Sequence, residues 1–90
     1  MKYAPVYTTQ LQKDIKRVQR QHKDTEKFKA AVVMIVRGEP LPARYRNHKL
    51  IGSYKDRWEC HIEPDWLLIY KIDGATVIFE RTGSHAELFE

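Results

Sequence analysis

Apolar residues recur at helical spacing in two stretches of the first half of the chain. In the first stretch they lie three or four residues apart among charged residues, at Leu11, Ile15 and Val18. Thr9, followed three residues later by Gln12, forms a capping-box pattern that is typical of a helix start. We therefore expect a helix that begins here and ends near His22.

The second stretch follows Asp24, whose carboxylate can accept hydrogen bonds from the first-turn amides of a helix. Its apolar stripe consists of Phe28, Ala31, Val32 and Ile35. Gly38, with two prolines just beyond it, predicts the end of this helix. Because only a short connection separates the two helices, they should form an antiparallel helical hairpin.

The remaining pattern is typical of β-strands and tight turns. Strands are predicted at residues 2–7, 58–62, 66–72 and 75–81, and a short strand near Leu50. Pro64 ends the strand at 58–62, and Asp73-Gly74 predicts a two-residue hairpin turn. Residues 39–49 read as a loop.

After a break at Gly83, residues 84–89 can form one helical turn capped by Ser84. The order of elements predicts a single α+β domain over residues 1–90. It should contain an N-terminal strand and an antiparallel helical hairpin packed on one face of a mainly antiparallel sheet.

The predicted turn also sets a register for the last two strands. If Asp73-Gly74 forms the loop, Ile72 pairs with Ala75 and Trp66 pairs with Arg81. Trp66 and Arg81 should then face each other at the far end of the hairpin, close to Asp65. This places an indole, a guanidinium and a carboxylate at one end of the sheet.

Composition narrows the class of protein. The chain has 90 residues, a net charge of +4 and a single cysteine, so it offers no internal disulfide. It has no apolar run of the roughly 20 residues that span a bilayer and no secretory signal at its start, which predicts a cytoplasmic protein without a membrane partner. Basic residues are frequent at 13–29 and 37–57, which favours an anionic partner such as nucleic acid or an acidic protein.

Candidate chemistry lies in the second half, which holds three of the four histidines: His48, His61 and His85. Histidine can donate or accept a proton near neutral pH, and Asp65 can act as a base or orient a histidine. When the 2′-hydroxyl of the RNA is the nucleophile, cleavage needs such proton-transferring groups and a cation that stabilises the phosphate, but it does not need a metal. Arg81 could supply the cation. These residues together predict a ribonuclease site.

Other interpretations stay open at this point. Trp66 could be a core residue, and Arg81 could pair with Glu59, Glu80 or Glu87. A zinc site could use His48, Cys60, His61, Asp65 or His85. The spacing matches no structural zinc pattern, and Cys60 and His61 should face opposite ways on a strand, so we expect neither a metal nor a cofactor.

Several motifs resemble one family. The chain contains Leu41-Pro42-Ala43-Arg44-Tyr45-Arg46-Asn47-His48-Lys49-Leu50, Gly52-Ser53-Tyr54-Lys55, His61-Ile62-Glu63-Pro64-Asp65-Trp66 and Arg81-Thr82-Gly83-Ser84-His85. This pattern closely resembles the YafQ branch of the RelE toxin superfamily, from about Leu41 to the end. The better-known RelE branch relies on lysine, arginine and tyrosine, so its roles do not transfer to this histidine-rich chain.

The resemblance implies the toxin of a bacterial type II toxin–antitoxin pair. Such toxins enter the ribosomal A site and cut mRNA there, leaving a 2′,3′-cyclic phosphate and a 5′-hydroxyl. The implied partners are a cognate antitoxin, the ribosome with its rRNA, and mRNA; operator DNA is bound only through the antitoxin complex. The alternatives are a non-catalytic module that binds the ribosome or the antitoxin, and a DNA-binding regulator, which the absence of a helix-turn-helix pattern disfavours.

The resemblance also implies roles for individual residues. The family's site positions match His48, His61, Asp65, Trp66, His85 and Phe89, with Arg81 as a phosphate contact. His85 is implied as the general acid and Asp65, helped by His61 or His48, as the base, although the two roles could be exchanged. Trp66 and Phe89 would hold the nucleotide.

Overall fold

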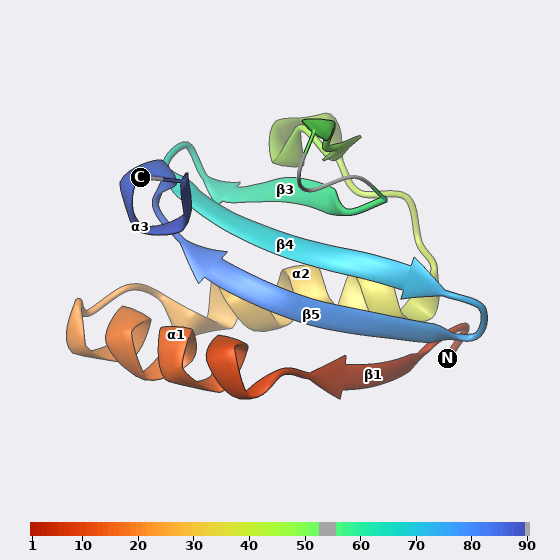
Figure 1. The fold of residues 1–90 in the computed structure, drawn as a ribbon, viewed down its shortest axis with the longest axis horizontal. Helices are drawn as coiled ribbons and strands as arrows, with labels where there is room; N and C mark the ends of the chain where they lie inside the picture. Colours follow the sequence, from red (N-terminus) through yellow and green to blue (C-terminus); the bar gives the residue numbers. More distant parts are fainter. Residues whose placement is uncertain (53–55, 90) are drawn as a thin grey trace.

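The computed structural model describes residues 1–52 and 56–89. A five-stranded sheet in the order β1-β5-β4-β3-β2 runs through the molecule (Figure 1). The strands are β1 (Ala4–Tyr7), β2 (His48–Lys49), β3 (Trp58–Glu63), β4 (Trp66–Asp73) and β5 (Thr76–Gly83). β1 lies parallel to β5 and the other neighbours are antiparallel, so the α+β, mainly antiparallel prediction is confirmed.

Two helices, α1 (Thr9–Arg20) and α2 (Thr25–Arg37), connect β1 to the rest of the sheet. They run in roughly opposite directions, and α2 lies behind the sheet in Figure 1. The N-cap of α1 is Thr8 rather than Thr9, because the Thr8 hydroxyl accepts the hydrogen bond from the Leu11 amide at 3.0 Å. Among the described residues, no helix has the length and apolar character to cross a bilayer.

The predicted limits of α2 are confirmed. The Asp24 carboxylate accepts from the Glu26 amide at 3.0 Å, as an N-cap does. Gly38 ends the helix in the left-handed region, with φ +72°, where glycine avoids the steric cost of a side chain. The apolar faces of both helices pack on one face of the sheet, in a core that includes Leu11, Val18, Ala31, Ile35, Leu68 and Phe79.

The β4–β5 hairpin differs from its predicted register. Asp73 pairs with Thr76, so the turn residues are Gly74 and Ala75 instead of Asp73 and Gly74. An irregularity between Ile69 and Tyr70 on β4 then shifts the pairing once more, because β5 carries an extra residue there. Together these shifts place Arg81 opposite Ile69, on the other face of the sheet from Trp66, so the predicted Trp66–Arg81 pair is wrong.

The loop at residues 39–49 also contains more structure than predicted. It holds a short 3-10 helix, η1 (Ala43–Tyr45), whose Tyr45 is buried, and the edge strand β2. The predicted short strand near Leu50 therefore lies slightly earlier, at His48–Lys49. Leu50 and Ile51 themselves are not in a strand, and the motif residues 53–55 lie outside the described residues.

An aromatic row crosses the sheet on its helix-covered face. The register aligns Tyr7, Phe79, Tyr70 and Trp58 on neighbouring strands, with Lys49 at the β2 edge. Tyr7 stacks on Phe79 at 5.5 Å between ring centroids, and Trp58 stacks on Tyr70 at 6.5 Å. The buried middle of this row stabilises the core, whereas its two ends reach the edges of the sheet.

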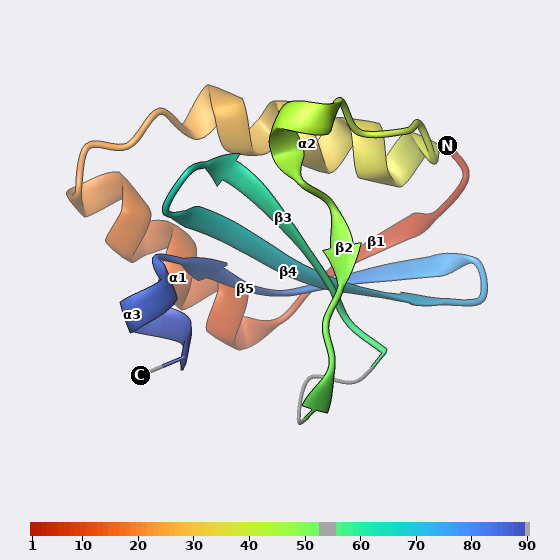
Figure 2. The same ribbon diagram turned by 90° about the horizontal axis from the view of Figure 1, so that it is seen from above.

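The opposite face of the sheet carries the short C-terminal helix α3 (His85–Phe89), on the side away from α2 (Figure 2). Leu88 from α3 packs on Leu67 and Ile69 in a second, smaller apolar cluster. The predicted Ser84 cap is confirmed, since the Glu87 amide donates to the Ser84 hydroxyl at 3.2 Å. This face holds most of the candidate site.

Candidate active site

Three histidine rings lie side by side on the open face of the sheet. His48 comes from β2, His61 from β3 and His85 from the first residue of α3. The ring centroids are 6.3 Å apart for His48 and His61 and 5.9 Å apart for His61 and His85. Phe89, one helical turn after His85, extends the series at 6.1 Å. The structure therefore brings together the three histidines and Phe89 that the sequence indicated.

Glu59 lies between two of these histidines, and the sequence analysis did not count it as a site residue. Its Oε1 atom is 3.2 Å from His61 Nε2 and 3.8 Å from His48 Nε2. The Glu59 side chain is almost completely buried. The available signal was the alternation along β3, which places Glu59 and His61 on the same face, but its closeness to His48 depends on the β2–β3 pairing.

Backbone carbonyl groups fix the orientation of both rings. His48 Nδ1 lies 2.7 Å from the carbonyl oxygen of Arg46, and His61 Nδ1 lies 3.2 Å from that of Pro64. A carbonyl oxygen only accepts, so each Nδ1 carries a proton and each Nε2 is directed toward Glu59. In its doubly protonated form His61 donates to both of its neighbours, which pairs an imidazolium with the Glu59 carboxylate.

Asp65 binds His85 through two contacts. Its Oδ1 atom accepts a hydrogen bond from the His85 backbone amide and lies 2.9 Å from His85 Nδ1, the same distance as to the amide nitrogen. These contacts hold the pKa of the Asp65 carboxyl below its ordinary value, with the backbone hydrogen bond as the largest cause. Asp65 therefore stays ionised and leaves the Nε2 atom of His85 as the ring nitrogen that can meet a ligand.

The three histidines differ in their access to solvent. The side chains of His48 and His85 are 51% and 55% exposed, whereas that of His61 is only 9% exposed. An exposed proton donor or acceptor thus lies on each of two sides of a nearly buried imidazole. This arrangement can transfer protons at two atoms of one bound group and place positive charge between them.

Trp66 is not a surface residue of this site. It is fully buried in the main core, and its indole N–H donates to the Thr82 hydroxyl at 2.9 Å. A ring without exposed area cannot stack on a nucleotide, so the expectation that Trp66 holds the substrate is wrong. The alternative that it is a core residue is confirmed.

Arg81 lies on the open face, separated from Glu59 by strand β4. Its guanidinium binds the fully buried Asp14 of α1, with Nε 2.8 Å from Oδ2. The structure therefore pairs Arg81 with Asp14 of α1. Burial alone would raise the pKa of Asp14, but hydrogen bonds from Arg81, Thr82 and Gln10 outweigh burial and lower it.

The same part of α1 also fixes α3. Arg17 donates to the Thr82 carbonyl at 2.7 Å and lies 3.0 Å from Glu87 Oε2, which also accepts from Gln21 at 2.9 Å. The Ser84 amide donates to Glu87 at 2.8 Å and is the main cause of the lowered pKa of that carboxyl. These contacts, with Leu88 below, hold the helix that carries His85 and Phe89 against the sheet.

One group of potential metal ligands is present among the described residues. The ligand atoms of His48, Glu59 and His61 lie within 4.8 Å of one another. Two imidazoles and a carboxylate suit zinc or copper. Cys60 is excluded from this group, because it faces the buried core and burial raises the pKa of its thiol to about 12.

Comparison with known proteins identifies the family of this chain. The family described as the bacterial toxin of the type II toxin–antitoxin system, YafQ, matches residues 3–90. The mRNA interferase toxin YafQ of Escherichia coli K12 is 46% identical over 84 residues, which cover 92% of this chain and 91% of that protein.

Solved structures show the same similarity. A chain in the crystal structure of the E. coli DinJ–YafQ toxin–antitoxin complex superposes with a TM-score of 0.93 at 43% identity, and the match covers 100% of both chains. A metal-bound toxin from Helicobacter pylori superposes with a TM-score of 0.91 at 34% identity, over 97% of this chain and 99% of that one. The chain therefore belongs to the YafQ family of bacterial toxins of type II toxin–antitoxin systems.

Proposed function

We propose that this toxin is an mRNA interferase, an endoribonuclease that acts as one domain over residues 1–90 and cuts mRNA in the ribosomal A site. The observation that carries the proposal is the row of His48, His61 and His85, in which two exposed imidazoles flank a nearly buried one. The name of the E. coli K12 relative, an mRNA interferase toxin, supports the same activity.

The proposed reaction uses the RNA 2′-hydroxyl as the nucleophile. His48 Nε2 takes the hydroxyl proton, and Glu59 stabilises the imidazolium that forms. The 2′-oxygen attacks phosphorus while the bond to the 5′-oxygen breaks, and His85 Nε2 donates a proton to that leaving oxygen. The products are a 2′,3′-cyclic phosphate and a 5′-hydroxyl, and the His48 and His85 roles could be exchanged.

His61 and Asp65 assist without exchanging protons with the substrate in this scheme. His61 lies between Pro64 and Glu59, and in its doubly protonated form it places positive charge where the phosphate gains negative charge. Asp65 holds the Nδ1–H tautomer of His85, as a carboxylate does for a catalytic histidine. This revises the sequence-based hypothesis, in which Asp65 was the base, because both of its contacts are with His85.

Phe89 is the proposed nucleotide contact. Phe89 is 41% exposed and its ring lies next to His85, so a base can stack on it beside the scissile bond. Arg81 stays a candidate phosphate contact only as a long-range charge, because Asp14 binds its guanidinium.

A cognate antitoxin is the proposed protein partner, because the E. coli relative has been solved in complex with the antitoxin DinJ. The net charge of +4 suits both an acidic antitoxin segment and RNA. Operator DNA would be bound only through that complex. The toxin would act in the cytoplasm, where its ribosomal partner is found.

A second candidate property is metal binding at His48, Glu59 and His61. The closeness of the three ligand atoms favours it, and so does the metal-bound state of the H. pylori structure. A bound ion would occupy the nitrogen lone pairs that the base needs. We therefore propose that such an ion inhibits cleavage instead of assisting it.

Induced expression in bacteria without the antitoxin tests the proposed activity. Growth should stop with the wild-type chain and continue with His85→Ala at equal protein level. A non-catalytic module that blocks the ribosome would arrest growth in both cases, and that outcome would contradict the proposed chemistry.

A further inference from the structure

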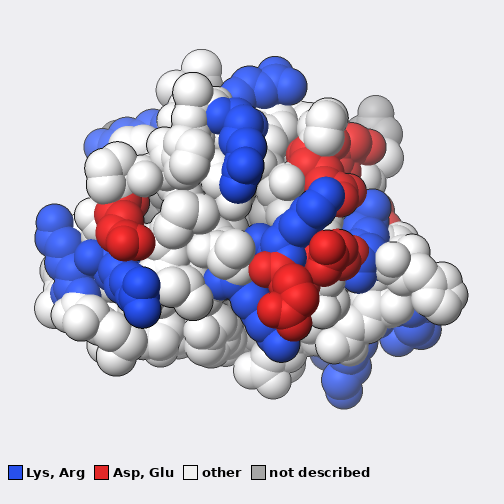
Figure 3. All heavy atoms as spheres, turned by 180° about the vertical axis from the view of Figure 1, so that it is seen from behind, with Lys and Arg blue, Asp and Glu red and all other residues white. Residues whose placement is uncertain are grey.

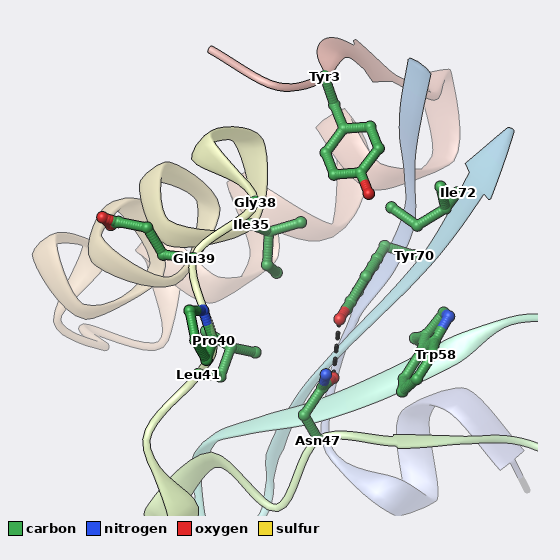
Figure 4. Close-up of a pocket in the computed structure, with 10 residues that line it drawn as sticks. All are labelled: Tyr3, Ile35, Gly38, Glu39, Pro40, Leu41, Asn47, Trp58, Tyr70 and Ile72. Carbon is green, nitrogen blue, oxygen red and sulfur yellow. Dashed lines mark hydrogen bonds between the residues drawn. The ribbon is translucent and has the colours of Figure 1, made fainter. Parts of the chain in front are cut away.

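The aromatic row ends, at the β2 edge, in a ring that the core covers only in part. Trp58 is half-buried and stacks on Tyr70 with an interplanar angle of 13°. It also lines two hollows, of about 180 Å³ and about 480 Å³. Figure 4 shows the smaller hollow, with the rings of Tyr3, Tyr70 and Trp58 around it. Packing in the core explains the position of Tyr70, but it leaves part of Trp58 accessible.

Lysine ammonium groups lie over two of the aromatic rings that line these hollows. Lys49 Nζ is 5.5 Å from the centre of the Trp58 ring, and Lys2 Nζ is 5.5 Å from that of Tyr3. Lys71 lines the larger hollow together with Tyr3 and Trp58. A cation beside an open aromatic face is the combination that binds single-stranded RNA, because bases stack on the ring and phosphates bind the cation.

Net charge alone does not identify this part of the surface as an RNA-binding site. Acidic side chains also border it: Glu39 lines the smaller hollow and Asp56 the larger one. On the face behind the sheet, acidic and basic side chains are likewise interspersed (Figure 3). The inference therefore rests on the pairing of rings with amines and on the position of this edge.

That position is directly behind the candidate active site. His48 pairs with Glu59, and the next pair along the same two strands is Lys49 with Trp58. Successive strand residues point to opposite faces, so the two pairs lie back to back. Because β2 is the outermost strand, a single-stranded RNA can pass around this edge from one pair to the other.

We propose that Trp58, Tyr3, Lys49 and Lys71 form a second RNA-binding site, separate from the cleavage site. An unpaired base stacks on Trp58, and the Lys49 side chain, which now lies over the ring, moves to a neighbouring phosphate with Lys71. The proposal relies on the proposed function only for the choice of RNA as the ligand. It requires no cleavage.

The test measures the affinity of the purified toxin for a labelled single-stranded RNA with 2′-O-methyl groups, which lacks the nucleophile for cleavage. Fluorescence anisotropy over a series of salt concentrations gives both the affinity and its salt dependence. Lys49→Gln with Lys71→Gln should weaken binding about tenfold and reduce the slope of log K against log salt by roughly 1.4, about 0.7 for each lost phosphate contact. Lys13→Gln with Lys16→Gln, at exposed positions of α1, is the matched control and should change neither quantity as much.

The ring is tested separately from the charges. Trp58→Leu should weaken binding about tenfold, and Trp58→Phe should restore most of the affinity because a stacking ring remains. Equal losses in Phe and Leu variants would overturn the stacking role. Equal losses in the two lysine pairs would overturn the site, because they would reflect net charge alone.

The same variants added to ribosomes without mRNA identify the source of the RNA. If the variants bind more weakly only to free RNA, the ligand of the second site is the message. If they also bind more weakly to vacant ribosomes, the ligand is rRNA. Unchanged affinity and salt slope with both ligands would overturn the proposal. Neither binding experiment depends on cleavage. If the toxin does not cleave RNA but its variants lose affinity as described, the proposed function is contradicted and the second RNA-binding site is supported.

Discussion

Asp65 Oδ1 accepts the backbone amide of His85 and meets the ring nitrogen of the same residue, each at 2.9 Å. The first contact fixes the start of α3 against the β3–β4 corner, and the second fixes the tautomer of the imidazole. In the proposed mechanism, the residue that was expected to be the base therefore positions the acid.

Replacing Asp65 with Asn should keep the fold and reduce cleavage. The carboxylate is exposed and the oxygen of an amide can still accept from the His85 backbone amide, so the fold should be kept, but the neutral amide no longer stabilises a positively charged His85. We expect kcat to fall by about 10- to 100-fold with little change in KM, measured on ribosome-bound message. Asp73→Asn, at the exposed end of β4, is the control and should cleave like the wild type. Equal kcat in the wild type and Asp65→Asn would disprove the positioning role.

Zinc or copper ions should bind the toxin and inhibit it. Isothermal titration should show binding that Glu59→Gln weakens at least tenfold, because a neutral amide is a poor ligand for these ions. Glu63→Gln is the matched control, since Glu63 lies on the same strand and pairs with Lys27 instead. Cleavage should survive a chelator that leaves the magnesium of the ribosome in place. Loss of activity on chelation, with recovery on adding zinc, would contradict a metal-free reaction.

Substitutions at Trp66 and at Phe89 should have different effects, the first mainly on stability and the second mainly on cleavage. Trp66→Ala leaves a cavity in the core and removes the indole donor to the Thr82 hydroxyl, so it should lower the free energy of unfolding by about 3–5 kcal/mol. Phe89→Ala should lower it by less than about 1 kcal/mol and reduce cleavage about tenfold through lost stacking. Urea denaturation and cleavage of ribosome-bound message check the two effects. A fully stable Trp66→Ala variant would contradict the core assignment.

Asp14 should contribute stability that depends on pH. Its pKa is lowered in the folded state, so its carboxylate stabilises the fold fully above the unfolded value of about 3.9. The contribution is lost as the pH falls through the folded pKa. Asp14→Asn should therefore cost about 3 kcal/mol at pH 7, where Arg81 loses a buried ionic partner, and less at pH 3. Urea denaturation at both pH values measures the difference, and an equal cost at pH 3 and pH 7 would contradict this origin.

The sequence predicted most elements because their boundaries have local signals. Each boundary residue lies at the start or the end of one helix or strand, where the sequence predicted it: Asp24, Gly38, Pro64 and Ser84. The register of the last hairpin was wrong because the turn lies one residue later than predicted and because the extra residue of β5 has no local signal. The extra residue is what moves Arg81 to the other face from Trp66.

The candidate site was predictable only in part, for a related reason. The histidines and Asp65 could be selected by their chemistry, and the family resemblance added Phe89. Glu59 lies in the site because β2 pairs with β3, and Trp66 lies outside it because it is completely buried. Both facts depend on contacts between distant segments, which spacing along the chain does not reveal.

We propose that His85 donates the proton in the cleavage of ribosome-bound mRNA. The most direct measurement maps new 5′ ends on a message in a reconstituted translation reaction, with the wild-type toxin and His85→Ala side by side. We expect cuts at A-site codons with the wild type, at least 100-fold fewer with His85→Ala, and none on RNA without ribosomes. Undiminished cutting by a folded His85→Ala variant would contradict it.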